Sequence, residues 1–170
     1  MDAPADVVKR PAAVALTRSA PPGRARARGP RGVVLEALGR NWLMTIEHKD
    51  WRPRRPGERV AEIGPLRVQP GKRYSALFME AVTAPGWSSA VHSHSGPEAW
   101  FTTSGETCLE TPSGTIVGRP GAPAIVPEGP PMFLTAIGTE TRRAITLILH
   151  DASRPPTTAE HDWKPKGLCR

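Results

Sequence analysis

The chain has 170 residues, the length of one ordinary domain, and 38% of them are hydrophobic. Its 20 prolines and 16 glycines are spread between short apolar runs, which disfavours long helices and favours many short strands. The net charge of +7 resides mostly in residues 1–31, and no apolar run approaches the ~20 residues of a membrane-spanning helix. Composition therefore disfavours a membrane protein and a nucleic-acid-binding face on the folded body.

Residues 1–31 are rich in Pro, Ala, Gly and Arg and show no sustained period. We predict a flexible, disordered basic arm over this range. Its arginines could touch an anionic surface such as a nucleic acid, but a solvated tail is the simpler interpretation. The stretch "KRPAAVALTRSA" makes a poor signal peptide because its apolar part is short and contains a proline. We therefore predict a cytoplasmic protein, with a periplasmic or secreted location as the alternative.

Residues 32–163 are predicted to form the folded body. The segment Val33–His48 is apolar enough for a short helix or strand packed on that body, and the pattern does not distinguish the two. A proline-punctuated connection with a basic cluster (Arg52, Arg54 and Arg55) follows. Strand signals then recur at 73–84, 88–94, 98–106, 107–118, 122–131, 132–138 and 142–151.

About seven short strands separated by turns predict an all-β sandwich or barrel. Pro112-Ser113-Gly114 is predicted to form a hairpin turn. Residues 164–170 are predicted to be a C-terminal tail. The two cysteines, Cys108 and Cys169, do not form a CxxC pair, which disfavours a cysteine zinc site. They could form one disulfide that ties the C-terminus to the body, but two unpaired thiols are the simpler interpretation.

The stretch "GWSSAVHSHSGPEAWFTTSG" carries the chemistry. Residues i and i+2 of a strand point to the same face, so His92 and His94 project together. The turn after them reverses the chain, and Glu98 begins the next strand, where it can lie across from the histidine pair. Two imidazoles and one carboxylate suit one divalent cation of Fe, Mn, Zn or Ni and leave coordination positions open. The alternative is that both histidines are exposed polar residues on a strand edge.

This stretch resembles the first motif of the cupin superfamily, G-x5-H-x-H-x3-E-x6-G, at every fixed position: Gly86, His92, His94, Glu98 and Gly105. The stretch "GAPAIVPEGPPMFLTA" resembles the second motif, G-x5-P-x-G-x2-H-x3-N, in part. It matches at Gly121, Pro127 and Gly129 but has Met132 at the position of the fourth ligand and Ala136 at the last. The resemblance implies a small single-domain cupin barrel, a double-stranded β-helix or jelly roll, with the metal inside it.

The resemblance also implies a homodimer that pairs through barrel edges or swapped N-terminal strands, a part that Val33–His48 could play. Met132 is a soft, weak ligand, so we expect it to line the cavity with a hard or borderline metal. The alternative is a barrel that has lost its metal. His150 could in principle supply a fourth ligand, but we expect a structural or exposed role. By alternation, Trp100 and Thr102 share the inward face of Glu98 and are predicted to line the cavity.

Two functions are open. The first is a metal-dependent enzyme acting on a small-molecule substrate, with an oxygenase-like reaction favoured over isomerisation. The second is a non-catalytic module that binds or senses a metal or ligand. No general acid or base is assigned: Glu80 and Glu110 lie on predicted strands, and each is expected to face solvent. No helix-turn-helix pattern is visible, which disfavours a complete transcription regulator.

Overall fold

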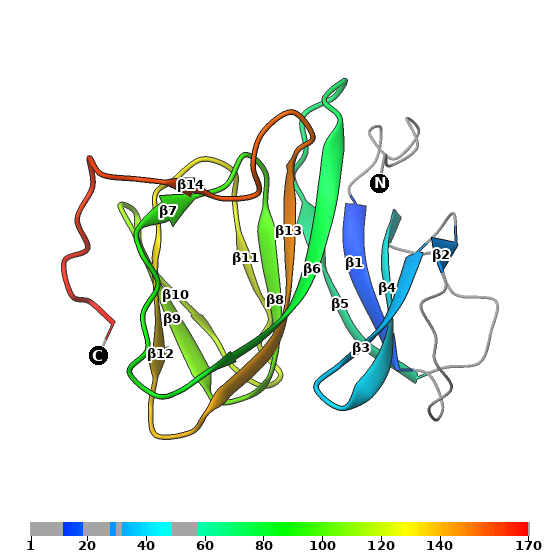
Figure 1. Cartoon of the computed structure of the whole chain (residues 1–170), viewed down its shortest axis with the longest axis horizontal. Coiled ribbons are helices and arrows are strands. Elements are labelled where there is room, and N and C mark those ends of the chain that lie inside the picture. Colours follow the sequence, from blue (N-terminus) through cyan, green and yellow to red (C-terminus); the bar gives the residue numbers. More distant parts are fainter. Residues whose placement is uncertain (1–11, 19–27, 30–31, 49–57, 170) are drawn as a thin grey trace. The chain divides into compact units, whose positions relative to one another are not determined.

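The structure, a computed structural model, describes residues 12–18, 28–29, 32–48 and 58–169. The elements assigned in these ranges are all β-strands, as Figure 1 shows. The prediction of an all-β chain is therefore confirmed. No helix long and apolar enough to cross a membrane occurs within those ranges. The chain divides into two compact units, Pro4–Gly71 and, with Met1–Ala3, Lys72–Arg170.

The first unit contains a five-stranded antiparallel sheet in the order β2-β3-β4-β1-β5. Its strands are β1 (Ala12–Arg18), β2 (Arg28–Gly29), β3 (Gly32–Ala37), β4 (Arg40–His48) and β5 (Glu58–Leu66). Strands β3 and β4 form a hairpin whose two turn residues, Leu38 and Gly39, have φ angles of 52° and 68°. Positive φ at both turn positions matches the twist of the flanking strands. The segment Val33–His48 is thus a strand pair rather than a helix.

Two of these strands, β1 and β2, fall within residues 1–31, where the sequence predicts a flexible arm. The remaining residues of that range lie outside the described residues, and so does the basic cluster Arg52, Arg54 and Arg55. The domain boundary at residue 31 therefore stays a prediction.

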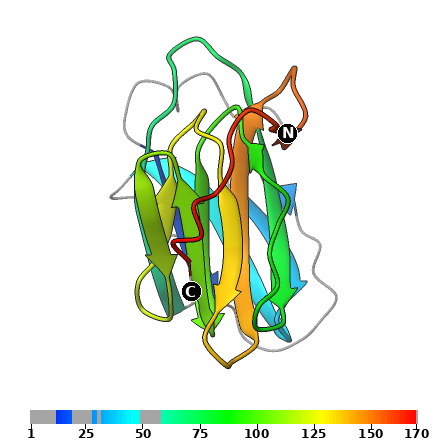
Figure 2. The ribbon, with the colours of Figure 1, turned by 90° about the vertical axis from the view of Figure 1, so that its left-hand side faces the viewer.

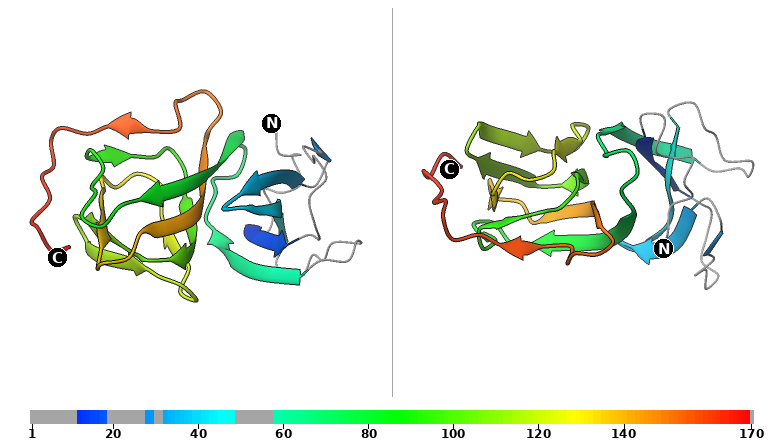
Figure 3. Two further views of the ribbon diagram at one scale, coloured as in Figure 1. Left: turned by 60° about the horizontal axis from the view of Figure 1, so that its bottom comes forward. Right: turned by 90° about the horizontal axis from the view of Figure 1, so that it is seen from above.

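The second unit, the barrel unit, contains two larger antiparallel sheets and one short strand pair. The four-stranded sheet has the order β11-β8-β13-β6, the three-stranded sheet has the order β10-β9-β12, and β14 pairs with β7. Figures 1 and 3 show the two larger sheets facing each other, which is the double-stranded β-helix arrangement that the sequence predicted. The strands are β6 (Tyr74–Thr83), β7 (His92–Ser93), β8 (Glu98–Ser104), β9 (Glu106–Thr111), β10 (Gly114–Gly118), β11 (Ala124–Val126), β12 (Phe133–Ile137), β13 (Arg142–Asp151) and β14 (Thr158–Ala159).

The core of the barrel unit lies between these two sheets. Its buried residues come from strands of both sheets and from the segment before β12: Trp100, Leu109, Ala124, Val126, Met132 and Leu134. Side chains alternate between the two faces of a strand, so Thr107 shares the inward face of Leu109 on β9. Cys108 and Glu110, on the same strand, therefore belong to its outer face.

The hairpin between β9 and β10 turns at Pro112-Ser113-Gly114, as the sequence predicted. The Thr111 hydroxyl makes two hydrogen bonds to the backbone of this turn. It donates a hydrogen bond to the Gly114 carbonyl at 3.0 Å and accepts one from the Ser113 N–H at 3.2 Å. A short polar side chain at the start of a turn commonly closes it in this way.

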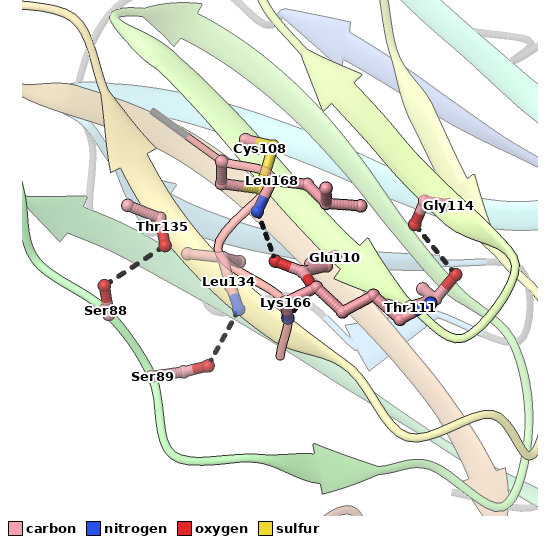
Figure 4. Close-up of a disulfide and its surroundings, with 11 residues drawn as sticks. Ser88, Ser89, Cys108, Glu110, Thr111, Gly114, Leu134, Thr135, Lys166 and Leu168 are labelled. Carbon is pink, nitrogen blue, oxygen red and sulfur yellow. Dashed lines mark hydrogen bonds between the residues drawn. A yellow bond between two sulfur atoms is a disulfide. The ribbon is translucent and has the colours of Figure 1, made fainter. Parts of the chain in front are cut away.

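The C-terminal strap, residues 160–169, is fastened to the outer face of β9. Cys108 and Cys169 form a disulfide, so the simpler interpretation of two unpaired thiols is wrong. Figure 4 shows the Glu110 carboxylate beside this bond, accepting hydrogen bonds from the backbone N–H groups of Lys166 and Leu168. Figure 2 shows the strap, in red, passing over the three-stranded sheet. Burial under this strap is the reason that Glu110 does not face solvent as expected, whereas Glu80 does.

A Glu110→Gln variant is expected to lower the free energy of unfolding by about 2 kcal/mol. The amide would present a donor to one of the two backbone N–H groups and leave a buried donor unpaired, which costs on the order of 1–3 kcal/mol. The matched control is Glu80→Gln, which removes the same charge from an exposed position on β6. Urea denaturation measures the free energy of unfolding of both variants. Equal values would contradict a stabilising contribution of the Glu110 hydrogen bonds to the strap.

Candidate functional site

The two histidines of the first motif are positioned by a short backbone pairing. His92 and Met132 exchange two backbone hydrogen bonds, of 3.1 Å and 2.8 Å. The carbonyl of His94 accepts a further bond, of 3.1 Å, from the Gly129 N–H. The segments of the two cupin-like motifs therefore lie side by side, and the two imidazole rings stand edge to face with centroids 5.0 Å apart.

Both imidazoles are oriented by backbone carbonyls. The Nδ1 atom of His92 lies 2.8 Å from the Ala90 oxygen, and the Nδ1 atom of His94 lies 2.6 Å from the Pro156 oxygen. A carbonyl oxygen can only accept, so both Nδ1 atoms carry the proton. In each neutral ring the lone pair is then on Nε2. A histidine that ligates a metal through Nε2 usually donates its Nδ1 proton to an acceptor in the same way.

His94 and Glu98 face each other in the interior of the barrel unit. His94 Nε2 lies 3.5 Å from Glu98 Oε2, and the side chains are only 2% and 7% exposed. Neither atom has a hydrogen-bond partner within the described part of the chain. Burial by itself lowers the pKa of His94, but its interactions with the Glu98 carboxylate and the Pro156 carbonyl outweigh burial and raise it. Either a proton on His94 or a cation between the two groups would satisfy this pair.

The predicted ligand triad is only partly assembled. His92 contacts His94, and His94 faces Glu98, but no group of three His, Cys, Asp or Glu side chains in the described ranges is arranged to hold a metal ion. The donor chemistry nevertheless fits a divalent cation, because two buried ligand atoms converge and the adjacent imidazole presents the same tautomer.

The loop between His94 and Glu98 is pressed against β13. The Leu149 N–H donates to the Pro97 carbonyl at 3.0 Å, and the Asp151 N–H donates to the Ser95 hydroxyl at 3.1 Å. A Cβ atom at Gly96 would lie 1.9 Å from the Leu149 carbonyl oxygen. Only glycine allows this approach, which keeps Glu98 in reach of His94.

The three residues predicted to line the cavity are all buried. Trp100 and Met132 have no exposed surface, and both belong to the apolar core. Thr102 is 2% exposed, and its hydroxyl and the Trp100 indole Nε1 have no hydrogen-bond partner in the described ranges. Glu98, Trp100 and Thr102 alternate along β8, so three buried polar atoms without partners follow one face of this strand.

Arg142, the first residue of β13, was not among the residues predicted from the sequence to lie at the site. This arginine is 2% exposed, and its guanidinium lies 5.7 Å from the centre of the Trp100 ring. Burial lowers its pKa, while the Glu98 carboxylate acts in the opposite direction. The signal in the sequence was the pair Arg142-Arg143, since alternation along a strand turns one of two adjacent residues inward. Arg143 is the exposed member.

His150 has the structural role that we expected. Its Nδ1 atom donates to the carbonyls of Asp151 and Arg154, each at 2.9 Å. These bonds fix the end of β13 and the turn that follows it.

No family model matches the chain, and no curated protein matches it either. Solved structures that it resembles include a cupin-like protein of Thermotoga maritima, with a TM-score of 0.45 and 17% identity over 50% of this chain and 64% of that one. Another is a Klebsiella pneumoniae protein with a double-stranded β-helix domain, with a TM-score of 0.43 and 17% identity over 57% of this chain and 77% of that one. A third is oxalate oxidase in complex with the substrate analogue glycolate, with a TM-score of 0.42 and 17% identity over 49% of this chain and 45% of that one. At this level of identity these likenesses concern the fold alone.

Proposed function

We propose that the chain is a metal-binding cupin in which His94 and Glu98, joined by His92, hold one divalent cation. The observation that carries this proposal is the buried pair of ligand atoms 3.5 Å apart, His94 Nε2 and Glu98 Oε2, which have no other partner among the described residues. The third ligand would come from the His92 ring, whose centroid lies 5.0 Å from that of His94. Its Nδ1 is already held by a carbonyl, as a metal-ligating histidine requires.

The proposed activity is that of a metal-dependent enzyme on a small molecule, with an oxygenase-like reaction favoured. Three protein ligands leave positions for a substrate and oxygen, and the bound metal would supply Lewis-acid or redox chemistry there. The chain's own contribution is a buried interior in which Trp100 and Thr102 follow Glu98 along one face of β8. The alternative is a non-catalytic module that binds or senses the same metal. Oxygen uptake during a substrate screen separates the two.

The test of the metal site is elemental analysis of protein purified without chelator. We expect about one divalent ion per chain in the wild type and at least a tenfold loss in His94→Ala, because a site with two protein ligands holds a cation weakly. His161→Ala, which removes an exposed histidine, is the control and should retain the metal. Protons compete with the metal for His94, so bound metal should fall as the pH is lowered. Equal metal in wild type and His94→Ala would defeat the assignment, and so would metal-free wild-type protein that also fails to take up added Fe, Mn, Zn or Ni.

The compartment and the oligomeric state remain proposals. Disulfides persist in oxidising compartments, so the Cys108–Cys169 bond favours the periplasmic or secreted alternative over the cytoplasm. A homodimer is proposed from the family resemblance, and light scattering in solution would test it.

A further inference from the structure

A buried arginine needs a counter-charge, and no described residue forms an ion pair with Arg142. Its Nε and Nη2 atoms are buried and have no hydrogen-bond partner in the described ranges. Leaving a guanidinium in this state is costly, because each unpaired buried donor loses its hydration without compensation. The Glu98 carboxylate acts on the guanidinium electrostatically, but Glu98 Oε2 is itself without a hydrogen-bond partner.

The Arg142 guanidinium lies beside Trp100, which belongs to the apolar core of the barrel unit but carries an indole N–H without a partner in the described ranges. The guanidinium lies 5.7 Å from the centre of the Trp100 ring, and a Cβ at Gly118 would lie 3.2 Å from that ring and 3.7 Å from the Thr102 hydroxyl. Gly118 is paired across the sheet with Thr107, whose buried hydroxyl also has no partner among the described residues. Strands from both sheets thus contribute buried polar atoms without partners in the described ranges, on Trp100 and Thr102 of β8 and on Thr107 of β9.

We propose that Arg142 is the anchor for a negatively charged ligand, a carboxylate or a similar oxyanion, bound between the two sheets beside Trp100. A guanidinium presents several N–H groups in a planar fork that matches a carboxylate, and the Trp100 and Thr102 donors can complete the set.

A divalent cation at the site proposed above would further favour an anionic ligand, and this step rests on the proposed function. A divalent cation and Arg142 contribute three positive charges to the interior, and Glu98 contributes one negative charge. Two positive charges are then uncompensated. Buried charges need partners of opposite sign, so a metal-loaded interior favours a ligand that is itself an anion. The proposed substrate class is therefore a small carboxylate or oxyanion rather than a neutral molecule.

The test is an NMR titration that follows the Trp100 indole N–H, run on the zinc-loaded and the chelator-treated full chain. Probes are sodium acetate, malonate and phosphate at constant ionic strength, with neutral acetamide for comparison. We expect a saturable shift of the Trp100 resonance with at least one anion and none with acetamide. Arg142→Gln should weaken that binding by about tenfold or more, the loss expected for charge-assisted hydrogen bonds. Arg143→Gln, which removes the exposed neighbour, should leave it unchanged.

Arg142→Lys provides a second test in case the Gln variant does not fold. Lysine keeps the positive charge but lacks the planar set of N–H donors of the guanidinium. This variant should bind the anion at least several-fold more weakly than the wild type. Anion binding that is equal in wild type and both Arg142 variants would overturn the proposal, as would the absence of a saturable shift with all three anions. A shift in protein that binds no metal would support the anion site while the metal site fails. Metal binding without any anion-induced shift of the Trp100 resonance would support the metal site and overturn the anion site.

Discussion

A Cys169→Ser variant is expected to have a free energy of unfolding about 4 kcal/mol lower than that of the wild type. The bond joins residues separated by 61 positions, and closing a loop of that length restricts the unfolded chain by roughly this amount. Urea denaturation under oxidising conditions measures the difference.

Reduction provides the matched control for this prediction. Treating the wild type with dithiothreitol should lower its stability to that of Cys169→Ser, whereas the same treatment should leave the variant unchanged. If the variant and the wild type unfold within about 1 kcal/mol of each other, the bond does not stabilise the fold in the way that loop closure requires.

A Gly96→Ala variant is expected to lose about 3 kcal/mol of stability and to bind less metal at the site proposed above. The added methyl group would lie 1.9 Å from the backbone oxygen of Leu149, and a backbone atom on a central strand cannot move aside cheaply. The loop between His94 and Glu98 must then lift away from β13. That movement separates the two groups that face each other at 3.5 Å. Metal content and urea denaturation should change together.

The control for Gly96→Ala is Gly121→Ala. Gly121 has a φ of +77°, and a Cβ there would meet nothing within 4 Å, so this substitution introduces backbone strain without a clash. It should cost about 1 kcal/mol and leave the metal in place. Full metal content in Gly96→Ala would show that this close approach does not position the ligands.

Short-range patterns predicted the strands of the barrel unit well. Period-two alternation and turn residues act over a few positions, so the hairpin at Pro112-Ser113-Gly114 could be located without any knowledge of the partner strands. The pairing of His94 with Glu98 has the same origin, because the two residues are separated by one tight loop. The segment Val33–His48 was harder, since its apolar runs fit a helix or a strand until the Leu38-Gly39 turn is recognised.

Contacts between distant segments could not be predicted. Glu110 accepts bonds from residues 56 and 58 positions away, and no local pattern distinguishes it from exposed Glu80. Arg142 was missed for a related reason. The run that follows it is buried on both faces, so alternation of polar and apolar residues does not show which arginine turns inward.

The carbonyl that orients the His94 imidazole belongs to Pro156, in the segment that leads from β13 into the strap. The same stretch of chain therefore carries the disulfide to Cys108 at one end and, at the other, a carbonyl that accepts a hydrogen bond from the His94 ring. Reduction of the disulfide would release the C-terminal end of this stretch, and the hydrogen bond to the His94 ring would then depend on the pairing of β14 with β7. Binding of a cation at the proposed site would then depend on the redox conditions around the protein.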